Sequence, residues 1–128
     1  MFNVRTIAFV LTLAGSVAAL SVASVASAKG GDGVRVLGAC TQHSTAKLKL
    51  GREDSGIEVE FEVDQNHNGV PWKVTLRRNG SLVASTTATT RGPSGSFELR
   101  RLVSGAHGTV TAVATRSSGE RCSARASI

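Results

Sequence analysis

Residues 57–64 read IEVEFEVD, and this stretch decides the fold class. Its apolar side chains, Ile57, Val59, Phe61 and Val63, alternate one by one with acidic residues. Successive side chains of a β-strand point to opposite faces of the sheet, so the alternation places one face in a core and the other in solvent. The stretch therefore predicts a half-buried β-strand.

The same period of two recurs along the chain on both sides of this stretch. It is found over residues 46–50, 72–77, 97–100, 110–115 and 121–128. No comparable stretch repeats its apolar residues at three and four positions, the spacing of an amphipathic helix. About seven short strands separated by turn sequences indicate an all-β protein, either a single antiparallel β-sandwich or a small barrel.

One tight turn is predicted at Asn79-Gly80, between two strand patterns. A type I′ hairpin turn needs positive φ at both central positions, which Asn and Gly tolerate best. We expect this turn to place Val83 opposite Leu76.

A second hairpin is predicted between residues 46–50 and 57–61. Pairing Lys49 with Glu58, and Lys47 with Glu60, sets opposite charges across the strands. Such pairs contribute only a few tenths of a kcal/mol each, but they favour this register over a slip of one residue.

Length and composition limit the architecture to one small domain. The chain has 128 residues, 41% of them hydrophobic, and a net charge of +6. If residues 1–28 are a cleaved signal peptide, as argued below, 100 residues remain. A chain of that length forms one hydrophobic core and not two. We expect that core to consist of Leu48, Leu50, Val59, Phe61, Trp72, Val74, Leu76, Phe97, Leu99 and Val110.

The N-terminal segment is typical of a secretory signal peptide. Arg5 precedes an apolar run over residues 7–20, and Ala26-Ser27-Ala28 has the small side chains that signal peptidase accepts. An uncleaved membrane anchor is the alternative, because the run is long enough to cross a bilayer. The Ala, Ser and Gly residues of its second half favour cleavage after Ala28 and release to the extracellular side. No stable membrane insertion is expected after that cleavage.

These boundaries divide the chain into a signal peptide over 1–28, a flexible leader over 29–39 and a sandwich domain over 40–128.

Cys40 and Cys122 are the two cysteines. Because an exported chain oxidises its thiols, we expect them to form a disulfide. Residues 37–40, LGAC, also resemble a lipidation motif, but charged residues separate them from the apolar run and disfavour lipidation.

Three segments give the strand order a likeness to known sandwiches. Residues 72–76 would be a central strand with its core Trp, residues 96–99 a later strand, and residues 109–116 a strand before a tight turn. This order resembles the immunoglobulin and fibronectin type III domains. The chain departs from them because its cysteines lie near the first strand and on the last, and because it contains no Tyr for a tyrosine corner.

The whole chain also resembles small secreted single-domain proteins of high-GC Gram-positive (actinobacterial) bacteria. The preference for Arg over Lys and the abundance of Ala, Val, Gly and Thr suit that source. It implies an immunoglobulin-like fold and an extracellular location. It implies no chemistry for any residue.

One loop partly matches a calcium-binding sequence. Asp64, Asn66 and Asn68 are followed by Gly69, as in the first half of an EF-hand loop. The twelfth position, where a bidentate Glu is needed, is Thr75. The loop is therefore a weak candidate, and we expect no metal and no cofactor.

Catalytic motifs are missing from the sequence. His43, His67 and His107 lie in separate polar loops, and no two have the spacing of metal ligands. The chain has no G-x-S-x-G nucleophile motif. We therefore expect a protein that is not an enzyme.

The remaining feature is a basic face on one predicted sheet. Its outward cations are Lys73, Arg77, Arg121 and Arg125, and the residues between them are mostly Thr and Ser, with no acid. Arg pairs phosphate and carboxylate with two parallel hydrogen bonds, so this face suits an anionic envelope polymer or an acidic protein. Outward aromatics that would stack bases are missing, which disfavours a dedicated nucleic-acid domain. The alternative is that the cations only solvate the sheet, and that the protein acts through a sheet edge or loops.

Overall fold

A computed structural model describes residues 33–128, so the predicted signal peptide over 1–28 lies outside the described residues. The described part of the chain forms strands and no helix. The strands are β1 Val34–Leu37, β2 Ala39–Cys40, β3 Thr45–Glu53, β4 Gly56–Asp64, β5 Pro71–Arg78, β6 Ser81–Thr89, β7 Ser96–Ser104, β8 Thr109–Thr115 and β9 Arg121–Ser127.

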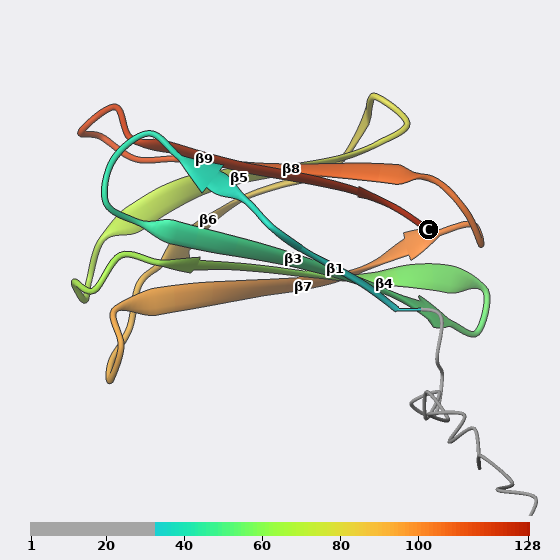
Figure 1. Cartoon of the computed structure of the whole chain (residues 1–128), viewed down its shortest axis with the longest axis horizontal. Coiled ribbons are helices and arrows are strands. Elements are labelled where there is room, and N and C mark those ends of the chain that lie inside the picture. Colours follow the sequence, from blue (N-terminus) through green and yellow to red (C-terminus); the bar gives the residue numbers. More distant parts are fainter. Residues whose placement is uncertain (1–32) are drawn as a thin grey trace, which may run out of the picture.

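Two antiparallel sheets stack face to face as a sandwich (Figure 1). One sheet has the strand order β1-β3-β4-β7, and the other has the order β2-β9-β8-β5-β6. The all-β sandwich predicted from the sequence is confirmed. The strands that carry the four predicted basic residues, β5, β8 and β9, lie in one sheet, as predicted.

The structure corrects the strand number and the extent of the flexible leader. Nine strands replace the expected seven within residues 33–128, because residues 34–40 form β1 and β2. Val34 and Val36 are half-buried against the core, and β1 pairs with β3. Gly38 then lets the chain cross to the second sheet, since a Cβ there would stand 2.6 Å from the Ser123 carbonyl oxygen.

The hairpin of β3 and β4 has a different register from the expected one. Lys49 lies opposite Glu60 and Lys47 opposite Glu62, a shift of two residues along β4. The predicted strands leave residues 51–56 as a six-residue loop, but β3 and β4 extend into it and are joined by only two residues, Asp54-Ser55. The shorter connection changes which residues lie opposite one another. A shift of two keeps every side chain on its predicted face, since the period of a strand is two.

The hairpin of β5 and β6 turns at Asn79-Gly80, as predicted, with φ of 49° and 83° at these two residues. The expected pairing of Val83 with Leu76 is wrong. A bulge beside Leu76 and Arg77 inserts one extra residue into β6, so that Ala84 lies opposite Leu76.

All ten residues of the predicted core are buried. Phe97 joins the two sheets, with its ring centroid 6.3 Å from that of Phe61 and 6.2 Å from that of Trp72. On β8 and β9 the buried residues are mostly small. These small residues are Ala112, Ala114, Cys122, Ala124 and Ala126.

Candidate functional site

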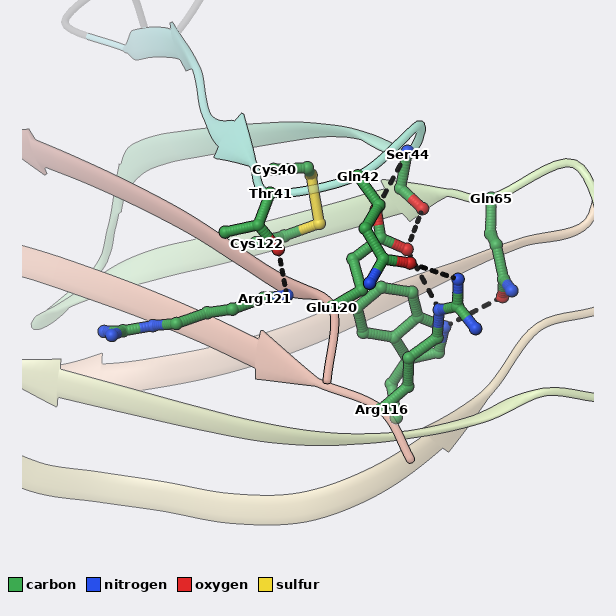
Figure 2. Close-up of a disulfide and its surroundings, with 10 residues drawn as sticks. Cys40, Thr41, Gln42, Ser44, Gln65, Arg116, Glu120, Arg121 and Cys122 are labelled. Atoms are coloured by element: carbon green, nitrogen blue, oxygen red, sulfur yellow. Dashed lines mark hydrogen bonds and ion pairs between the residues drawn. A yellow bond between two sulfur atoms is a disulfide. The ribbon is translucent and has the colours of Figure 1, made fainter. Parts of the chain in front are cut away.

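The predicted disulfide joins Cys40 to Cys122, and this confirms the pairing expected from the sequence. The two residues are direct partners on the neighbouring strands β2 and β9. Figure 2 shows the bond at the start of β9, next to Arg121. The Thr41 Oγ1 accepts a hydrogen bond of 3.0 Å from the Arg121 backbone N–H, so the crosslink and this bond fix where β9 begins.

The buried carboxylate of Glu120 lies close to the disulfide in the sequence and binds the loop that follows β2. The Glu120 side chain is 1% exposed and accepts hydrogen bonds from the Ser44 backbone N–H at 3.0 Å, the Ser44 hydroxyl at 2.9 Å and the Arg116 Nε at 2.9 Å (Figure 2). Arg116 also donates to the Gln42 Oε1 at 3.1 Å and lies 5.6 Å above the Trp72 ring. The network ties the loop after β2 to the turn between β8 and β9.

Two opposing effects set the pKa of Glu120. Burial of the carboxylate raises it, while the hydrogen bonds from Ser44 and the charge of Arg116 lower it more, so the pKa lies below its ordinary value. The carboxylate is therefore ionised at neutral pH and holds its three donors.

The four predicted basic residues lie together on the outer face of the second sheet. Lys73 is the strand partner of Thr115, which is the partner of Arg121, and Arg77 is joined through Thr111 to Arg125 in the same way. These two rows cross β5, β8 and β9. The four cations therefore stand at the corners of a rectangle of about 10 Å across the strands and about 13 Å along them.

We call this surface the basic face and define it by Lys73, Arg77, Arg121 and Arg125, all of which are exposed. Arg77 donates one hydrogen bond of 3.4 Å to the Gly80 carbonyl. Within residues 33–128, the side chains of Lys73, Arg121 and Arg125 make no hydrogen bond or ion pair. Figure 2 shows the Arg121 side chain extended away from the disulfide. Most of the positive charge is thus open to an external anion.

A shallow groove of about 410 Å³ runs along one side of the basic face. Arg121, Arg125 and Leu37 line it, and Leu37 is 81% exposed. The rest of its lining is small or uncharged: Gly38, Ala39, Thr111, Val113, Ser123 and Ala124. The groove thus offers two guanidinium groups beside a short apolar contact.

The outer face of the first sheet has the opposite character. Lys49 lies 3.1 Å and Arg100 3.0 Å from carboxylate oxygens of Glu60, and Lys47 lies 3.4 Å from Glu62. The hydrogen bond from Lys49 is the main cause that holds the pKa of Glu60 below its ordinary value. Cations and acids neutralise one another on this face.

The candidate calcium loop has a structural use for its one carboxylate. The Asp64 Oδ1 accepts a hydrogen bond of 3.0 Å from the Asn66 backbone N–H, and Asn66 has a φ of 64°. Asn68 lies beside Gly92 of the neighbouring loop. In the described part of the chain, no three His, Cys, Asp or Glu residues stand close enough to hold a metal ion.

Sequence reasoning missed two parts of this site. Leu37 had been assigned to the flexible leader, although the alternation of apolar and polar residues over 34–37 is the same strand signal as elsewhere. Glu120 was not singled out either. Two features of the sequence could have drawn attention to Glu120. It is the one acidic residue in residues 99–128, and it stands two residues before Cys122.

Comparison of the chain with protein-family models, with curated proteins and with solved structures found no match. No helix within residues 33–128 is long and apolar enough to cross a membrane. The functional assignment therefore depends on the geometry and charge of the basic face.

Proposed function

We propose that the protein is a secreted, non-catalytic binding module that contacts anionic polymers of the cell envelope through its basic face. The observation that carries the proposal is the charge pattern. Four exposed cations surround Thr, Ser and Val residues with no acid among the described residues of that face. A low density of fixed cations on a flat sheet suits a repeating anion better than a single small ligand.

The groove gives the proposal its finer detail. Arg121 and Arg125 can each pair a phosphate or carboxylate with two hydrogen bonds, and Thr and Ser hydroxyls between them can bond to sugar or alditol oxygens. The exposed Leu37 adds an apolar contact for a substituent on the polymer. The described aromatic residues, Phe61, Trp72 and Phe97, are buried, so stacked bases have no platform here.

Retention by cell envelopes of the source organism, measured across a salt series, tests the proposal. The test variant replaces Arg77, Arg121 and Arg125 with Ser. Binding to a polyanion weakens with a slope of about 0.7–0.9 in log K against log salt for each contact, so four contacts give a slope near 3. The triple variant should lose most of its retention and most of that slope.

A matched control removes the same charge from the opposite face. Replacing Arg35, Lys47 and Lys49 with Ser also lowers the net charge by three. If position on the basic face matters, this control binds like the wild type. Equal losses in the two variants would mean that only net charge counts, and equal retention of all three proteins would refute the proposal.

Export is the second part of the proposal, and the disulfide supports it. Disulfides such as Cys40–Cys122 persist in oxidising compartments. Cleavage after Ala28 predicts that the protein collected from a culture medium begins at Lys29. Mass spectrometry of that protein checks the N-terminus, and retention of residues 1–28 would contradict it.

A module that acts through protein contacts at a sheet edge is the second candidate function. The uncharged edge strand β6 favours it. Binding through an interface with an apolar centre depends much less on salt than binding to a polyanion, so the same salt series separates the two.

A further inference from the structure

A second groove lies at one edge of the sandwich, between the start of β6 and the end of β7. Its volume of about 450 Å³ is within the range of small-ligand pockets. Two cations, Arg78 and Arg101, line it, and none of its described lining residues is acidic. It shares no lining residue with the groove beside the basic face, so it is a separate feature of the surface.

Arg78, the last residue of β5, is held in place by the loop between β7 and β8. Its Nη2 donates a hydrogen bond of 2.5 Å to the His107 carbonyl. Gly105 and Gly108 leave room for the guanidinium group, since a Cβ on Gly108 would stand 2.9 Å from the Nε and one on Gly105 would overlap the group. The Nε is buried and has no hydrogen-bond partner among the described residues, which costs free energy. The fold therefore keeps this guanidinium group in one place although one of its donors is unsatisfied.

Arg101 stands where the alternation of β7 would place an apolar residue. Leu99 and Val103, two positions before and after it, are buried, whereas Arg101 is exposed in the groove. Its Nη1 donates a hydrogen bond of 2.8 Å to the Arg100 carbonyl. The Arg100 side chain is paired with carboxylates on the outer face of the first sheet, but within residues 33–128 neither Arg101 nor Arg78 makes an ion pair. Both charges are thus left for an anion that enters the groove.

We propose that this groove binds a small organic carboxylate with an apolar body, of which a carboxylate on a short hydrocarbon chain is the simplest form. Each guanidinium group can donate two parallel hydrogen bonds to the carboxylate. Val83 and Leu102, which are 42% and 63% exposed, contribute apolar surface for the chain. A single negative charge fits this lining better than the double charge of a phosphate, because the larger charge costs more to bring beside apolar surface. The site does not depend on polyanion binding at the basic face.

Titration with octanoate, followed through the backbone amide signals in NMR spectra, tests the site. The protein is collected from a host that exports it from the full 128-residue chain. We expect saturable shifts for residues 78–83 and 101–104. Octan-1-ol lacks the charge and acetate lacks the chain, so each should bind at least about tenfold more weakly than octanoate. The proposal is overturned if octanoate causes no saturable shifts in these residues, or if either control compound binds as tightly.

The test variant, Arg101→Gln, removes one of the two guanidinium groups and should weaken octanoate binding about ten- to hundredfold. Its matched control, Arg100→Gln, removes the same charge from the next residue and should bind octanoate like the wild type. The amide signals of the core strands show that each variant is folded. An equal loss in the two variants would mean that net charge alone attracts octanoate. Unchanged binding by Arg101→Gln would mean that this arginine only protects the edge strand, and either result overturns the proposal.

The variant in which Arg77, Arg121 and Arg125 are replaced by Ser separates this site from the basic face. It should bind octanoate like the wild type, and Arg101→Gln should be retained by cell envelopes like the wild type. Loss of octanoate binding in the basic-face variant would place the carboxylate on that face and overturn the proposal for the groove. A protein that binds octanoate but not envelopes, or envelopes but not octanoate, therefore shows which of the two proposals has failed.

Discussion

Replacement of Glu120 by Ala should destabilise the fold more than replacement of any other single carboxylate. The side chain is 1% exposed and accepts three hydrogen bonds, two from Ser44 and one from Arg116. Removal leaves the Ser44 donors buried without an acceptor, which costs about 1–3 kcal/mol, and breaks a charged pair. A fully buried pair would cost about 3–5 kcal/mol, but Arg116 is 21% exposed and keeps Gln42, so we expect about 2–4 kcal/mol in total.

Urea unfolding at neutral and acidic pH measures this loss. Because the pKa of Glu120 is lowered in the folded protein, its stabilisation is present above the ordinary value of 4.5 and disappears as the pH falls through the lowered value. The difference between wild type and Glu120→Ala should therefore shrink in acid. Glu62→Ala is the control, since its exposed pair with Lys47 contributes less than about 1 kcal/mol. A loss below about 0.5 kcal/mol at neutral pH for Glu120→Ala would refute the reasoning.

Three further predictions concern stability. Replacing Cys40 and Cys122 together with Ala opens a loop of 82 residues and should cost about 4.5 kcal/mol in the chain-entropy model, measured by urea unfolding. Gly95→Ala should cost at least about 2 kcal/mol, because Gly95 has a φ of 69° and a Cβ there would overlap the backbone of His67; an unchanged melting temperature would contradict this. Glu60→Gln should make the melting temperature less sensitive to acid, because the wild-type carboxylate has a lowered pKa whose stabilisation is lost as the pH falls; identical pH profiles would contradict it.

The period of two carried most of the fold prediction. Alternation specifies which side of a strand is buried, and both the ten predicted core residues and the outward position of the basic residues depend on that one property. The register between strands depends on where a turn begins, and alternation does not contain that information. Gly51 and Glu53 look like loop residues in the sequence but extend β3, which moved the pairing by two.

Other features depend on contacts between distant segments. The bulge that displaces Val83 follows from fitting β6 to its partner strand and not from its own composition. Glu120 is a charged residue in a turn, where exposure is the usual outcome, and only the approach of Ser44 from the other end of the chain makes it a buried acceptor. The groove is likewise formed by Leu37 and Arg125, which are far apart in the sequence. Such features need the fold before they can be identified.

The number of cations does not distinguish the two outer faces of the sandwich. The first sheet presents Arg35, Lys47, Lys49 and Arg100, and the basic face presents four as well. The two faces differ in their acidic residues. On the first sheet the carboxylates lie within about 3–4 Å of the cations and cancel the positive potential that these cations would produce in the surrounding solvent. These acids are also farther from the basic face than the sheet spacing of about 10 Å, because their side chains point outward from the other sheet. A polyanion approaching the molecule therefore meets an uncancelled positive field on one face only. The position of acids, more than net charge, is what a binding experiment on this protein has to vary.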